Sequence, residues 1–106
     1  MRGTGTCRPL TPESVKAAVS DLNGRPIYLT LDLDVLDPSE FSGTGTPEPG
    51  GIRYHELMSC VGELREAARF IVGLDVVELA PRIDPSGASA IVAAKTVREL
   101  LLSLQV

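Results

Sequence analysis

The 106-residue chain is poor in several kinds of residue, and each shortage excludes a class of protein. No apolar run approaches the roughly 18 residues of a membrane-spanning helix, and the first residues, MRGTGTCRP, lack the apolar core of a secretion signal. The 10 basic residues are outnumbered by 14 acidic ones, which argues against a nucleic-acid-binding surface. We therefore expect a cytoplasmic protein that binds neither a membrane nor nucleic acid.

Cysteine and histidine are also scarce. Cys7 and Cys60 lie far apart in the sequence and are not spaced like the ligands of a zinc site, so we expect reduced thiols. The only histidine, His55, falls on a predicted helix and is interpreted as a surface or partly buried helix residue.

The residues that are abundant alternate in a pattern that predicts an α/β fold. Residues 11–22, 53–69 and a last segment ending near 104 carry apolar side chains at helical spacing. Residues 27–31 and 70–77 are apolar runs typical of buried parallel strands. This alternation implies a parallel sheet with right-handed crossovers. Two strands alone would leave both sheet edges open, so the chain is interpreted as a piece of a larger sheet.

Local signals fix the first helix. Thr11 is a suitable N-cap, and Pro12 is favoured at the first helical position. Asn23 and Gly24 tolerate positive φ and are expected to end the helix.

Acidic residues and a breaker-rich loop follow the first predicted strand. Asp32 and Asp34 are two residues apart, so they share one face if the strand continues, at the carboxyl end where α/β sheets bind ligands. Such close carboxylates repel unless a cation such as Mg²⁺, Mn²⁺ or Ca²⁺ lies between them. Asp37 precedes Pro38 and is expected to cap a turn. The loop 37–51, rich in Gly and Pro, is expected to form a rigid wall for a substrate.

Other motifs that contain acidic residues can be compared with the sequence of this stretch. A bare Asp-x-Asp is also compatible with a solvated strand end. A calcium-binding EF-hand would need Gly and Glu where the chain has Asp37 and Gly43. A phosphatase of the haloacid dehalogenase type would have Thr or Val at Leu36, and a Walker phosphate loop would need a Lys that this loop lacks.

Two long stretches resemble a known family. The stretch TLDLDVLDPSEFSGTGTPEPGG resembles a signature of the ureohydrolases, the arginase/agmatinase family, and GLDVVELAPRIDPSGASAIVAAKTVRELL resembles the family's C-terminal block. The loop GTGTPEPGG is closer to agmatinases than to arginases. Departures include Ser42 in place of Pro and Ser89 in place of Thr. The resemblance implies that residues 1–106 are the C-terminal segment of an incomplete ureohydrolase domain. This segment would contribute two strands and three helices to a parallel-sheet, three-layer α/β sandwich.

The resemblance also assigns roles. Asp32 would bridge two Mn²⁺ ions, Asp34 would bind one of them, and Glu78 would hold the substrate guanidinium through two parallel hydrogen bonds. Without the resemblance, Glu78 would be interpreted as a solvated acid at a strand end. In the family, a metal-activated hydroxide attacks the guanidinium carbon. Agmatine would give urea and putrescine, a step of polyamine biosynthesis. The signatures GGDHS and DAHxD, which supply the histidine ligands and the proton-transfer groups, are not in this sequence, so no catalytic set is complete in this chain.

We therefore expect a manganese-dependent, agmatinase-type C–N hydrolase acting on a guanidino substrate, inactive as this chain alone. The alternative is a non-catalytic, truncated paralogue that serves as an oligomerising interaction module. A phosphatase with Asp32 as nucleophile is a third possibility. Open sheet edges and apolar helix faces lead us to expect homo-oligomers.

Overall fold

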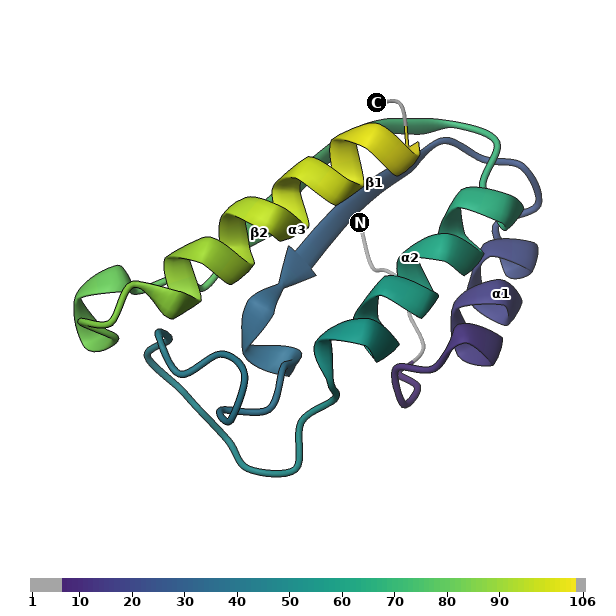
Figure 1. Ribbon diagram of the computed structural model, residues 1–106. Coiled ribbons are helices and arrows are strands. Elements are labelled where there is room, and N and C mark those ends of the chain that lie inside the picture. The colour runs from purple at the N-terminus through teal and green to yellow at the C-terminus, as the bar shows by residue number, and fades with distance from the viewer. Residues whose placement is uncertain (1–6, 105–106) are drawn as a thin grey trace, which may run out of the picture.

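The computed structural model describes residues 7–104 as a parallel sheet of two strands packed against three helices (Figure 1). The predicted α/β order is confirmed, with element ends within two residues of those expected. Two short 3₁₀ helices, η1 and η2, were not predicted. In chain order the elements are α1 (Pro12–Asp21), β1 (Ile27–Asp32), η1 (Leu33–Val35), α2 (Tyr54–Ala67), β2 (Ile71–Val77), η2 (Pro81–Ile83) and α3 (Ala88–Leu104).

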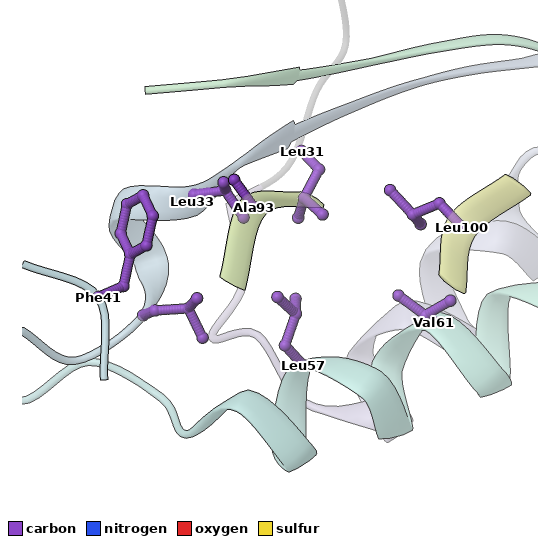
Figure 2. Packing of buried hydrophobic residues seen from close by; sticks show 8 residues of the cluster. Leu31, Leu33, Phe41, Leu57, Val61, Ala93 and Leu100 are labelled. Carbon is purple, nitrogen blue, oxygen red and sulfur yellow. The ribbon is translucent and has the colours of Figure 1, made fainter. Parts of the chain in front are cut away.

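The helices pack on one face of the sheet. Leu29 and Leu31 of β1 and Leu74 and Val76 of β2 join the hydrophobic cluster that α2 and α3 also enter, and α1 packs mainly against α2. Figure 2 shows α2 and two stretches of α3 on the same side of the strands. The pairing is parallel, as the sequence alternation predicts, and its register is regular from Tyr28 to Asp32.

The best-buried part of the core lies where β1 ends. Leu33, Leu36 and Phe41 follow β1 directly, and each is at most 1% exposed. They meet Leu57 of α2, and Figure 2 shows Phe41 and Leu33 beside Ala93 of α3. Burying a side chain of this size stabilises the fold by about 1.5–3 kcal/mol. These apolar side chains therefore anchor the acidic residues that alternate with them.

The opposite face of the sheet is bare among the described residues. Tyr28 and Val77 on this face are 61% and 38% exposed, and each strand has only one strand partner within residues 7–104. Because parallel sheets are normally covered on both faces, this surface is suited to contact with further polypeptide. The second helical layer of the expected three-layer sandwich is therefore not formed by these residues.

The local signals in the sequence act as expected. The Thr11 hydroxyl accepts from Ser14 N–H, and the Ser14 hydroxyl accepts from Thr11 N–H. Asn23 and Gly24 have positive φ (52° and 79°). Both cysteines are free, Cys7 exposed and Cys60 buried. Within the described residues, the helices are all too short or too polar to cross a bilayer.

Candidate active site

Asp32 and Asp34 are neighbours, but for a reason other than the predicted one. The strand ends at Asp32, and Asp34 lies in the 3₁₀ helix η1. The Asp32 carboxylate accepts a hydrogen bond from Asp34 N–H (3.0 Å) and so turns the chain. The condition for the expectation that both carboxylates share one face, a strand that continues to Asp34, is therefore not met, because this capping bond competes with continued extension.

Glu78 lies at the same edge of the sheet. Asp32 pairs with Val77 across the sheet, and Glu78 is the next residue along the chain. Glu78 has a φ of 77°, which is uncommon for a residue with a side chain. Such conformations cost about 1–3 kcal/mol and cluster at functional sites. This strain is an observation independent of sequence similarity that favours a functional role for Glu78.

Like charges accumulate at this edge. Asp32 remains in contact with solvent, yet partial removal from water raises the pKa of its carboxyl group, and the charges of Asp34 and Glu78 raise it further. The hydrogen bond from Asp34 N–H acts in the opposite direction. Neutralising part of this negative charge with a cation would therefore be favourable.

Sequence reasoning missed one contributor, Thr46. Its hydroxyl donates to the second carboxylate oxygen of Asp34 (2.9 Å), so the loop touches a candidate metal ligand directly. The available signal was a hydroxyl residue placed directly between two turn-forming residues, Gly45 and Pro47.

Asp37 organises the loop, as predicted. One carboxylate oxygen accepts from Gly50 N–H (2.9 Å), and the other accepts from the N–H and hydroxyl groups of Ser39. A short parallel bridge between Leu36 and Ile52 closes the loop at its base. The loop is therefore tied at its start and its end.

These contacts make stability depend on pH in a defined window. The hydrogen bonds from Ser39 and Gly50 lower the pKa of Asp37 to about 2, below its ordinary value of 3.8. Because the folded pKa is the lower one, this stabilisation is present above about pH 4 and is lost as the pH falls towards 2. We expect denaturant midpoints to fall across this window, and less steeply in Asp37→Asn and Ser39→Ala. If the denaturant midpoint falls equally steeply with pH in the wild type and in both variants, the hydrogen bonds of Asp37 are not the source of this pH dependence.

The donor set fits part of a metal site. Carboxylate oxygens suit Mn²⁺, and a divalent ion between Asp32 and Asp34 would relieve their repulsion. Within residues 7–104, no three His, Cys, Asp or Glu side chains lie close enough to hold an ion as a group. His55 is exposed on α2. The roles of Asp32 and Asp34 as metal ligands and of Glu78 as the guanidinium-binding acid thus stay predictions.

Parallel strands joined by a helical crossover and ending in acidic residues are typical of α/β proteins, a class that usually binds its ligands at the carboxyl ends of the strands. The chain belongs to the arginase family, whose family model matches residues 6–103. It is 44% identical over 90 residues to an agmatinase from Bacillus anthracis, covering 85% of this chain and 31% of that protein. The resemblance inferred from the sequence is therefore confirmed.

Solved structures place the fold in the same family. Proclavaminate amidinohydrolase from Streptomyces clavuligerus superposes with a TM-score of 0.76 at 33% identity, covering 86% of this chain and 30% of that one. Arginase from Bacillus caldovelox superposes with a TM-score of 0.72 at 34% identity, covering 83% of this chain and 30% of that one. The chain thus spans about a third of the length of the relatives it matches. Its fold is a partial arginase-like α/β domain of the ureohydrolase class.

Proposed function

We propose that this chain supplies two metal ligands and the guanidinium-binding acid of an agmatinase-like ureohydrolase. The observation that carries the proposal is the placement of three acids at one sheet edge: Asp34 N–H donates to the Asp32 carboxylate (3.0 Å), and Glu78 follows Val77, the partner of Asp32 across the sheet. The strained backbone of Glu78 supports it independently.

Each residue has a chemical task in this proposal. Asp32 and Asp34 would hold Mn²⁺, which when bound supplies activation of water for hydrolysis. Glu78 would accept two parallel hydrogen bonds from the planar guanidinium and orient its carbon towards the metal side of the site. Thr46 would fix the Asp34 carboxylate through the hydrogen bond between them. Agmatine plus water would give urea and putrescine.

The substrate and the fragment's inactivity are parts of the same proposal. Relatives with different names share this region, an agmatinase and a proclavaminate amidinohydrolase among them. Agmatine is favoured by the loop GTGTPEPGG. Two carboxylates form too small a donor set for a binuclear site, so we expect no Mn²⁺-dependent urea release from agmatine by this chain alone. Robust turnover by the 106-residue chain would contradict this.

A chimera tests the active-site roles directly. We define it as the Bacillus anthracis agmatinase with its matching C-terminal third replaced by this chain, to which it is 44% identical. We expect Mn²⁺-dependent urea release from agmatine. Asp34→Asn should lower it by more than about 100-fold, since even outer-shell partners of a metal cost 10- to 100-fold when lost.

Ser59→Ala is the matched control, because Ser59 bonds only a backbone carbonyl of its own exposed helix turn. It should leave turnover within about two-fold of the chimera, as surface changes usually do. An Asp34→Asn chimera that binds Mn²⁺ and turns over like the Ser59→Ala chimera would exclude Asp34 as a ligand.

A second property, self-association of the chain, is favoured by the open edges of the sheet. Val72 is 66% exposed on β2, and β2 has one edge without a strand partner within residues 7–104. We expect light scattering to detect oligomers of the 106-residue chain and Val72→Lys to shift them towards monomer. Leu102→Lys, a change at a similarly exposed residue of α3, is the control. A monomeric wild-type chain would contradict the expectation.

A further inference from the structure

Gly43 is held on both sides. Its N–H donates to the Ser89 hydroxyl oxygen (2.8 Å), and its carbonyl accepts from Ala80 N–H (2.7 Å). A Cβ at this position would lie 2.6 Å from the Cβ of Ser89, closer than side chains tolerate. Glycine is therefore what allows the loop to approach α3 so closely.

Gly43 and Ala80, the two partners of the second hydrogen bond, are each close in sequence to residues of the candidate site. Ala80 follows Glu78 by two residues. Gly43 precedes Thr46 by three, and Thr46 donates to Asp34. The hydrogen bond between Ala80 and Gly43 thus joins the segment of the guanidinium-binding acid to the loop that contacts a metal ligand.

Ser89 is itself oriented by an acid. Its hydroxyl donates to Asp84 (2.6 Å), so a lone pair is left to accept from Gly43, and Ser89 N–H donates to the same Asp84 oxygen (2.9 Å). Ser86 donates to the other oxygen through its N–H and hydroxyl groups. Ser89 is 1% exposed, so water does not compete for its hydroxyl. Hydrogen bonds to a charged acceptor are about twice as strong as neutral ones.

We propose that Asp84 and Ser89 form a positioning clamp for the site. Asp84 orients the Ser89 hydroxyl, Ser89 holds the Gly43 peptide, and Gly43 fixes the spacing between the Asp34 loop and Glu78. Neither clamp residue touches substrate. The inference rests on the proposed function for the meaning of that spacing, whereas the clamp itself is a property of this chain.

Hydrogen exchange, measured by mass spectrometry on the 106-residue chain without metal or substrate, tests the clamp. In Ser89→Ala we expect amide exchange to accelerate about 10-fold in two peptides, 42–47 and 77–81, since loss of a hydrogen bond of this kind is worth about that factor. Ser89→Thr, which keeps the hydroxyl, should restore slow exchange in both.

Val61→Ala is the control for general loss of stability, because Val61 is a buried residue of α2, and α2 contributes no residue to the clamp. In Val61→Ala, amide exchange in peptides 42–47 and 77–81 should accelerate no more than exchange in the rest of the chain. If Ser89→Ala does not fold, Asp84→Asn carries the same comparison, with acceleration expected in both peptides.

The proposal is overturned if exchange in 42–47 is unchanged, or if it accelerates while 77–81 stays slow. It is also overturned if the two peptides accelerate only as much as in Val61→Ala. The two experiments are independent. If the exchange result contradicts the clamp, turnover of the chimera still tests the proposed function. If the chimera is inactive, the exchange result still tests the clamp.

Discussion

Replacing Gly51 by alanine is expected to destabilise the chain by about 3 kcal/mol. A Cβ at this position would lie 2.5 Å from Asp37 N, 2.6 Å from Leu36 C and 2.7 Å from Val35 O. All three atoms belong to backbone, so relief requires the chain to move rather than a side chain to rotate. Overpacking typically costs about 1–3 kcal/mol, and rigid surroundings place this change at the upper end.

Gly51→Ala should also disrupt the hydrogen bonds that close the loop 37–51 at its base. Gly51 lies beside the bridge in which Ile52 N–H donates to Val35 (3.0 Å) and Asp37 N–H donates to Ile52 (2.9 Å). An added methyl group would push the two bridged segments apart and loosen the loop that carries Thr46. We therefore expect faster proteolysis of the loop in addition to a lower denaturant midpoint.

Gly45→Ala provides the matched control within the same loop. Nothing lies within 4 Å of a Cβ added there, and its φ is outside the positive region. Alanine at position 45 should be neutral or stabilising by up to about 1 kcal/mol, because it restricts the unfolded chain. Equal urea midpoints for the two variants would show that the Gly51 backbone is less crowded than its geometry indicates.

The parts of the fold that were predictable are those encoded by neighbours in sequence. Thr11 caps α1 through a residue three positions away, and Asn23–Gly24 form a turn from their own φ preferences. The run at Ile27 is recognised as a strand because it is apolar and lacks helical spacing. Asp37 could also be assigned to a turn locally, because Ser39 is two residues away.

The unpredicted parts depend on competition or on distant contacts. β1 ends at Asp32 because the hydrogen bond from Asp34 N–H to the Asp32 carboxylate outcompetes continued extension. The sequence pattern Asp-x-Asp is equally compatible with a strand that ends there and with one that continues. Thr46 finds Asp34 only after the loop has folded back, and Gly43 finds Ser89 across 46 residues. Such contacts are set by packing of the whole chain, so spacing in the sequence does not predict them.

Glu78 is where local rules and the folded structure disagree most clearly. A glutamate has no intrinsic preference for positive φ, whereas glycine adopts it readily. A chain selected only for stability would favour glycine at this position. That a carboxylate stands there instead, facing the charge of Asp32, is expected if the side chain is retained for binding.

Glu78→Gly and Glu78→Ala should therefore separate stability from function. Both variants remove the carboxylate, but only alanine keeps the Cβ that is strained at a φ of 77°. We expect the glycine variant of the 106-residue chain to be more stable than the alanine variant by about 1 kcal/mol in urea denaturation. Equal stabilities would show that position 78 carries no backbone strain.

In the chimera, both variants should lose agmatine hydrolysis alike, whatever their difference in stability. Loss of one partner of a desolvated charge pair costs about 2–5 kcal/mol, so kcat/KM should fall at least about 30-fold in each. Glu78→Gln keeps the size and the strain but cannot pair as an anion with the guanidinium, and it should fall by a similar factor. A glutamine or glycine chimera that hydrolyses agmatine at the parent rate would remove Glu78 from the substrate site and leave its strain without a function.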